Sequence, residues 1–204
     1  SSSETAKRYK GSSNWKKIID GVNVIVIVLK EVEVQEGDEP GQENPPSQEP
    51  GTTTPEGELG SQTNPVITWT DLQNLIENGT NPIYISGTMD ASETIMVTDA
   101  AVELISVGNT TITRNSLLSD ELFWSEQSLT FTGSLNAPII FAGNNVQATS
   151  PMISAAANLT MTYCTLQNNV NTSTSGGAIH ITEGVLELNH CFFESNKTMS
   201  STGQ

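Results

Sequence analysis

The stretch Asn-Leu-Thr-Met-Thr-Tyr-Cys-Thr-Leu-Gln-Asn-Asn, residues 158–169, decides the fold, because a copy of its pattern follows at residues 185–196. The copy reads Val-Leu-Glu-Leu-Asn-His-Cys-Phe-Phe-Glu-Ser-Asn. One constant offset matches these pairs: Leu159 with Leu186, Met161 with Leu188, Cys164 with Cys191, Leu166 with Phe193 and Asn169 with Asn196. Repeats of this length are typical of solenoids, in which each repeat packs only against its neighbours.

The apolar pattern of this repeat extends backwards through four coils. First strands are predicted to begin at Ile95, Leu122, Met152 and Ile179. Second strands are predicted at Val102, Leu129, Leu159 and Leu186, with apolar partners two residues later at Leu104, Phe131, Met161 and Leu188. Third strands are predicted at Ile112, Ile139, Leu166 and Phe193, with residues 83–85 as their forerunner. Alternation of period two that returns once per repeat predicts a parallel β-helix.

The predicted fold class is therefore all-β: a single-stranded parallel β-helix with three strands per coil and about 27 residues per coil. The strong bias of parallel crossover connections predicts a right-handed helix. A short amphipathic helix with Leu72, Leu75 and Ile76 on one face is expected to cover its first coil. Thr70 is the predicted N-cap with Gln73 reaching back to it, and the helix is expected to stop at Asn78-Gly79.

Stacked coils place equivalent side chains in ladders. The predicted structural ladder residues are Asn115, Asn169, Asn196, Cys164, Cys191, Leu159, Leu186, Met161 and Leu188. The asparagines follow the third strands by three residues, where Ala142 fills the remaining place, and their amides are expected to bond along the stack. The two cysteines are expected to stack as buried thiols or, alternatively, to form a disulfide.

Composition divides the chain into three parts. Residues 1–35 carry six Lys or Arg and read as a small β unit, with a continuous β-branched strand at 22–29 and an alternating one at 30–34. Residues 36–64 carry seven acids and no base, and their Pro, Gly and Thr content predicts a disordered linker. Residues 65–204 form the predicted β-helix. A further step of one repeat from Gly176 reaches Gly203, where another coil would start, so we expect the helix to be truncated at its C-terminal end.

The net charge of −15 argues against a nucleic-acid partner and against attraction to an anionic membrane. The longest apolar run, residues 24–29, is far too short to span a bilayer, so no membrane-spanning segment is predicted.

Two family resemblances follow from these residues. Gly176-Gly177-Ala178-Ile179-His180-Ile181, followed by the Leu-x-Leu-x-x-Cys-x-Phe-x-x-Asn pattern of residues 186–196, resembles the repeat of bacterial surface β-helices. These are the pectin-lyase-like and polymorphic outer-membrane-protein-like adhesins, and the resemblance implies an exported, cell-surface adhesin. The Tyr-Lys…Trp-Lys pattern within residues 9–18 resembles the end of a BspA-type leucine-rich-repeat module, with an ordinary amphipathic segment as the alternative.

Enzymes that cleave acidic polysaccharides also use pectin-lyase-like β-helices, so catalysis must be weighed. The predicted helix has only two bases, Arg114 and Lys197, which are too few to neutralise a uronate substrate. Candidate carboxylates for hydrolysis are Asp90, Asp99, Asp120, Glu121, Glu183 and Glu187. No two of them share a phase on adjacent coils, and we interpret them as solvated turn residues.

No catalytic, cofactor-binding or metal-binding residue is predicted. His180 and His190 lack neighbours at metal-ligand spacing, which leaves only weak Ca²⁺ binding by turn acids as an alternative. Five Asn-x-Ser/Thr sequons begin at Asn78, Asn109, Asn158, Asn171 and Asn196, and we interpret these asparagines as turn and ladder residues.

The expected function is that of a non-catalytic, extracellular or cell-surface, adhesin-like β-helix. It would act as a stalk or bind a glycan or a surface protein of a host or neighbouring cell. The alternative is the N-terminal part of a polysaccharide lyase or glycoside hydrolase whose catalytic coils follow residue 204.

Overall fold

The chain divides into two compact units, Ser1–Ser47 and Gln48–Gln204. The computed structural model describes residues 16–19, 22–25, 55–173 and 176–199. In the first unit, β1 (Lys16–Ile19) pairs antiparallel with β2 (Val22–Ile25). The remaining residues of the predicted 22–29 strand, the 30–34 strand and most of the 9–18 segment lie outside the described residues, as do linker residues 36–54.

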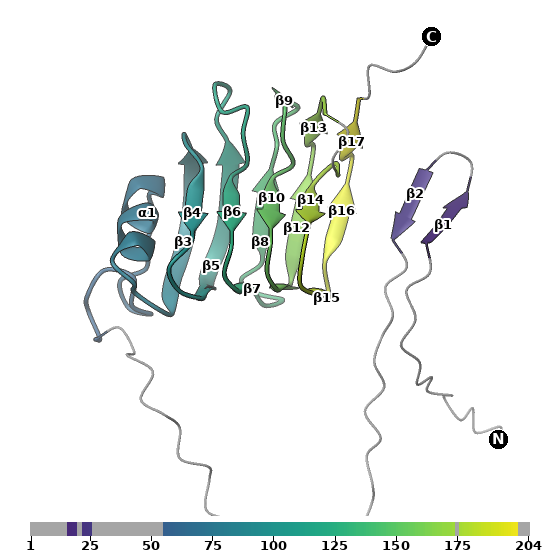
Figure 1. The fold of residues 1–204 in the computed structure, drawn as a ribbon. Coiled ribbons are helices and arrows are strands. Elements are labelled where there is room, and N and C mark those ends of the chain that lie inside the picture. The colour runs from purple at the N-terminus through teal and green to yellow at the C-terminus, as the bar shows by residue number, and fades with distance from the viewer. Residues whose placement is uncertain (1–15, 20–21, 26–54, 174–175, 200–204) are drawn as a thin grey trace, which may run out of the picture. The chain divides into compact units, whose positions relative to one another are not determined.

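The second unit is a parallel β-solenoid of about four turns with about 27 residues per turn, which confirms the predicted fold class. Its strands stack side by side, with the helix at one end of the stack (Figure 1). One sheet holds the first strand of each coil, in the order β14 (Ile179–Ile181), β10 (Ile153–Ala155), β6 (Phe123–Ser125) and β4 (Ile95–Val97).

The second and third strands of the coils share one larger sheet. Its order is β15 (Leu186–Asn189), β11 (Leu159–Thr162), β7 (Leu129–Thr132), β5 (Val102–Arg114), β8 (Ile139–Ala142), β12 (Cys164–Gln167) and β16 (Phe192–Glu194), and β3 (Ile83–Ala91) also pairs with β5. The second and third strands belong to one sheet because β5 runs without a break through the corner of the first coil. The first half of β5 pairs with β7, and its second half pairs with β8.

A third sheet of short strands was not predicted. It contains β17 (Lys197–Thr198), β13 (Val170–Asn171) and β9 (Gln147–Ala148), each of which follows the third strand of its coil. The coils after the first therefore have four strands: β6–β9 in coil 2, β10–β13 in coil 3 and β14–β17 in coil 4. Coil 1 consists of β4 and β5.

The register of the second strands agrees with the sequence pattern, whereas that of the first strands is shifted in two coils. Val102, Leu129, Leu159 and Leu186 pair in one row. In the first-strand row, Ile95 pairs with Phe123 and Phe123 with Ile153, so the predicted starts at Leu122 and Met152 are one residue early. The error arises because Leu122 and Met152 are also fully buried, which hides the phase of the strand that follows.

The third strands also differ from the prediction in one coil. Phe141, and not Ile139, lies between Ile112 and Leu166. The corner of coil 2 spans residues 133–138 and contains a bridge between Ser134 and Ala137. It is longer than the corner of coil 3, which turns at Tyr163. A two-residue shift keeps the inward phase of a strand, so alternation alone cannot detect it. Residues 83–85 pair with 104–106 and thus precede the second strands, while Met89 pairs with Ile112.

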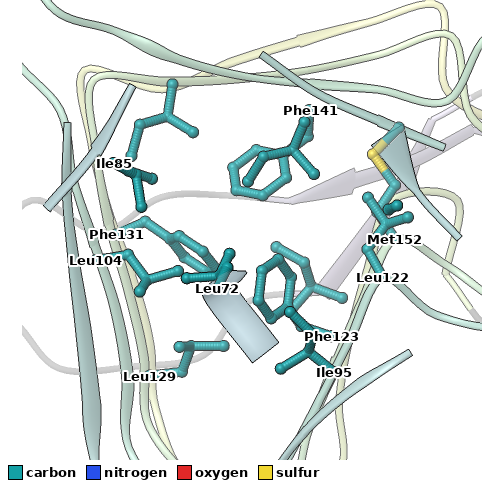
Figure 2. Close-up of a cluster of buried hydrophobic side chains, with 14 of the residues drawn as sticks. Leu72, Ile85, Ile95, Leu104, Leu122, Phe123, Leu129, Phe131, Phe141 and Met152 are labelled. Atoms are coloured by element: carbon teal, nitrogen blue, oxygen red, sulfur yellow. The ribbon is translucent and has the colours of Figure 1, made fainter. Parts of the chain in front are cut away.

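Aromatic rings fill the centre of the stack (Figure 2). Phe123, Phe131 and Phe141 are fully buried. The ring of Phe131 meets those of Phe123 and Phe141 edge to face, at centroid separations of 5.2 and 5.0 Å. Trp69 makes a similar contact with Phe123 at 5.2 Å, which ties the helix to the same cluster. Edge-to-face packing adds to the free energy gained from burial alone.

The capping helix α1 (Trp69–Glu77) is confirmed, but its N-cap is Thr68 and not Thr70. The Thr68 side chain accepts from the Asp71 N–H at 3.2 Å and donates to the Asp71 carboxylate at 2.6 Å. Because the helix begins directly after this cap, Trp69 enters the core, where its indole N–H donates to the Glu93 carbonyl at 2.9 Å. Gln73 bonds Glu77 instead of reaching back to the cap.

The far end and the buried face of α1 follow the sequence. The helix ends at Glu77 with Asn78 as its C-cap, and Gly79 adopts a positive φ of 74°, which glycine tolerates without strain. Leu72 and Ile76 are buried against the first coils. The helix therefore covers the end of the solenoid that would otherwise expose its core.

Residues 57–64, which fall within the predicted linker, are folded against this capped end. The Gly60 N–H donates to the Asn64 carbonyl, and the Gly60 carbonyl accepts from the Tyr84 N–H, both at 2.8 Å. Ser61 is buried and its hydroxyl accepts from the Gly57 N–H. Side-chain oxygens thus satisfy a turn that has little apolar surface to bury.

Replacing Phe131 by Ala should lower the free energy of unfolding by about 3–5 kcal/mol, because it removes the central ring of the cluster. Chemical denaturation measures this change. Thr130→Ala is the matched control, since Thr130 lies on the same strand and points outward, and it should cost less than about 1 kcal/mol. Equal losses from both variants would contradict the assigned inward phase.

Thr68→Ala should lower the free energy of unfolding by about 1 kcal/mol, whereas Thr70→Ala should leave it nearly unchanged. The difference follows from the cap, because the Thr68 side chain accepts from the Asp71 N–H. The two variants can be compared by thermal or chemical denaturation. A larger loss for Thr70→Ala would return the N-cap to the position that the sequence suggested.

Candidate functional site

The apolar ladder residues lie in rows that face the interior. Leu159 pairs with Leu186, and Met161 pairs with Leu188. Leu159 and Met161 are fully buried, and their partners in coil 4 are half-buried. Cys164 and Cys191 directly precede Thr165 and Phe192, which pair with each other, so the two cysteines occupy equivalent positions on neighbouring strands. Both are free thiols. These residues serve packing.

The asparagine side chains bond to the main chain. Asn196 Oδ1 accepts from the Asn169 N–H at 3.1 Å, and Asn196 Nδ2 donates to the Leu166 carbonyl at 2.7 Å. Asn169 is fully buried and donates to the Gly177 carbonyl, while its Oδ1 has no hydrogen-bond partner among the described residues. These amides therefore fix the turn that leads from one coil to the next.

Asn115 bonds elsewhere. Its Nδ2 donates to Asp90 Oδ2 at 2.6 Å, and its Oδ1 accepts from the Leu117 N–H at 3.0 Å. The described structure thus brings Asn169 and Asn196 together and ties Asn115 to the preceding coil through a carboxylate.

Arg114 is a buried structural residue. It is 1% exposed, and its guanidinium donates to the carbonyls of Leu118 (3.1 Å), Asp120, Ser150 (3.4 Å) and Pro151 (2.8 Å). Burial lowers the pKa of Arg114 to about 10, and the nearby carboxylates of Glu121 and Asp120 oppose that shift. The side chain therefore stays charged at neutral pH and joins the turn of coil 1 to that of coil 2.

This role of Arg114 was missed in the sequence, where the residue was considered as a base. The signal was available, because Arg114 continues the inward phase of Thr110 and Ile112 along β5. Lys197 is exposed on β17. Of the two bases in the solenoid sequence, Arg114 is thus bonded to main-chain carbonyls and cannot face a uronate substrate.

The candidate carboxylates are dispersed. Asp99 and Glu183 are both exposed and follow β4 and β14, which lie at opposite edges of the four-stranded sheet. Asp90 is bonded to Asn115, Glu187 lies 3.3 Å from Asn189 Nδ2, and Asp120 is exposed. Across residues 55–173 and 176–199, no three His, Cys, Asp or Glu side chains gather closely enough to hold a metal ion.

One outward-facing row combines an aromatic ring with polar groups. Parallel pairing places Met96 beside Trp124, Trp124 beside Ser154, and Ser154 beside His180, on the outside of the four-stranded sheet. We call these four residues the outer row. Met96 is exposed, Trp124 and His180 are half-buried, and Ser154 is 1% exposed. Neighbouring side chains therefore cover the small residue at its centre.

Glu121 joins the outer row from the turn before β6. Its carboxylate accepts a hydrogen bond from the Ser154 hydroxyl at 2.9 Å, and its main-chain carbonyl accepts from the Thr94 hydroxyl at 2.7 Å. The Ser154 proton is therefore directed to a carboxylate. The arrangement brings an indole ring, a carboxylate and an imidazole together on the outside of one sheet.

The outer row was not predicted, because its members have no residue type in common. The signal that could have found it is position: each is the middle residue of a three-residue first strand whose flanking residues point inward.

Another ring contact lies at the corner of coils 3 and 4. The rings of Tyr163 and His190 stack there, with 4.6 Å between their centroids.

No family model matches this chain, and no curated protein or solved structure shows significant similarity to it. In the described part of the chain, no helix has both the length and the apolar character needed to cross a membrane.

Arg114→Met should lower the free energy of unfolding by about 2–4 kcal/mol, because four main-chain carbonyls lose a charged donor in a buried position. Arg114→Lys should recover only part of this loss, since an ammonium lacks the planar fork of donors. Chemical denaturation measures both. Lys197→Met serves as the control at an exposed base and should change stability by less than about 0.5 kcal/mol. An Arg114→Met variant as stable as the control would contradict the structural role.

Proposed function

We propose that the chain is part of an exported, non-catalytic, adhesin-like protein that binds a neutral glycan through the outer row. The observation that carries this proposal is the stacking of Met96, Trp124, Ser154 and His180 in register on one sheet face. The C–H face of a sugar ring packs against an aromatic ring such as that of Trp124, whose π face is electron-rich. Glu121 and His180 supply hydrogen-bonding groups beside it.

Charge supports a neutral ligand rather than an anionic one. The net charge is −15, and the solenoid sequence from residue 65 contains only two bases. Arg114 is buried and bonded to carbonyls. A uronate polymer or another polyanion would therefore meet repulsion with almost no compensating cation.

The dispersal of the carboxylates supports a binding role over catalysis. A glycoside hydrolase requires two carboxylates that flank one bond, about 5–10 Å apart. Asp99 and Glu183 belong to opposite edges of the sheet, and Ser154 directs its proton to Glu121 rather than to His180. If the protein degraded a polysaccharide, its catalytic residues would have to lie outside the outer row.

Export to the cell surface is supported by two features. The acidic segment rich in Pro, Gly and Thr at residues 36–56 has the composition of spacers between surface modules, and the solenoid repeat resembles that of bacterial surface adhesins.

Trp124→Ala should reduce binding to the best neutral glycan at least tenfold, because the ring supplies the stacking surface. A panel of neutral and acidic polysaccharides, read by affinity electrophoresis or calorimetry, identifies the ligand with the unaltered chain. Phe192→Ala is the matched control: Phe192 is 69% exposed but lies on the other sheet, and its loss should not affect binding.

Thermal denaturation should first show that Trp124→Ala remains folded. Binding that is unchanged in Trp124→Ala, or a preference for acidic polymers, would overturn the proposal. Release of reducing ends or unsaturated products from any polymer in the panel would establish the enzymatic alternative instead.

A further inference from the structure

Cys164 and Cys191 face each other across the boundary between coils 3 and 4. The pairs Thr165–Phe192 and Leu166–Phe193 fix the register immediately after them. Cys164 is fully buried, and Cys191 packs against the same core while remaining partly exposed. The Cys191 thiol donates to the Met161 carbonyl of coil 3 at 3.3 Å, which holds its sulfur against the strand that precedes Cys164.

This placement suits a covalent link. Adjacent parallel strands lie about 4.8 Å apart. That spacing falls within the range of about 4.4–6.8 Å found between the Cα atoms of a disulfide. Both side chains point to the same interior side of the sheet, so closing the bond needs rotation of the thiols and no change in strand register.

We propose that Cys164 and Cys191 form a reactive dithiol that a small disulfide, such as glutathione disulfide, oxidises to a disulfide between the two coils. The site is distinct from the outer row and does not depend on the proposed glycan binding. It would give the solenoid a covalent connection between neighbouring coils in an oxidising environment.

The electrostatics assign a separate role to each sulfur. The neighbouring Cys164 thiol lowers the pKa of Cys191 to about 7, against the opposing effect of burial. The same contact, together with burial, raises the pKa of Cys164. Of the two sulfurs, Cys191 thus has the lower pKa, and it is also the one that a reagent can reach.

The reaction balances in two exchanges. The Cys191 thiolate attacks one sulfur of glutathione disulfide, whose S–S bond breaks as a Cys191–glutathione bond forms and one glutathione thiolate leaves. Cys164 then loses its proton and attacks Cys191 Sγ, which releases the second glutathione. The two departing thiolates take up the two protons of the cysteines, so the protein is oxidised by two electrons and the reagent is reduced by two.

The bond would close the loop of chain that runs from Cys164 to Cys191, which is one full repeat. Closing a loop of this size restricts the unfolded chain more than the folded one. For a chain of this length, the midpoint of thermal unfolding should rise by about 5–10 °C.

The test is incubation of the full chain with glutathione disulfide at pH 8, followed by non-reducing peptide mass spectrometry. The expected product is a monomer in which the peptides of Cys164 and Cys191 are joined with the loss of two hydrogens. Its thermal midpoint should be raised and should return to the starting value on reduction with dithiothreitol.

Two variants assign the roles. Cys164→Ser should stop at a stable mixed disulfide between Cys191 and glutathione, whereas Cys191→Ser should react far more slowly because Cys164 is buried. Persistence of both free thiols, a stable glutathione adduct on the unaltered chain, or disulfide-linked dimers would each overturn the proposal. Formation of the same disulfide at an equal rate in urea-unfolded protein would also overturn the proposal, because the fold would then not be what brings the two thiols together.

Discussion

Main-chain hydrogen bonding between parallel strands of successive coils is the constraint on which the rest of this structure depends. Each strand must find its partner one coil away, so residues a full repeat apart become neighbours, as in the row through Leu129, Leu159 and Leu186. Because the pairing is parallel and in register, an inward residue always stacks on an inward residue. The core, the corner asparagines and the outward rows all result from this single rule.

The corners absorb the differences in coil length. Coil 2 inserts residues 133–138 where coil 3 turns at Tyr163 alone, and β5 passes its corner without a break in the strand. Polar side chains stabilise these corners from within: Arg114 bonds four carbonyls, and Asn196 satisfies both an N–H and a carbonyl of the preceding coil. Regular strands and irregular corners together place Trp124 beside Ser154, and Cys164 beside Cys191.

The sequence predicted the fold well where burial and phase agree. Apolar residues two apart identified the second strands at their observed positions, because this spacing recurs in all four of them. The prediction for the first strand at Leu122 was one residue early because Phe123, directly after it, is equally apolar and buried. The prediction for the third strand at Ile139 was wrong because Phe141, two residues later, is also apolar and buried. The buried role of Arg114 and the outer row escaped prediction because they depend on which coils become neighbours, and residue type alone does not specify that.

The most direct test of this account is the measurement of contacts between methyl groups by nuclear Overhauser spectroscopy on the full chain. The account predicts cross-peaks from Leu159 to both Leu129 and Leu186, and from Ile153 to Ile179, all between residues about one coil apart. It also predicts that contacts typical of antiparallel hairpins, between strands such as β7 and β8 of the same coil, are missing. Hairpin contacts in place of these long-range pairs would contradict the solenoid, and with it the surfaces built upon it.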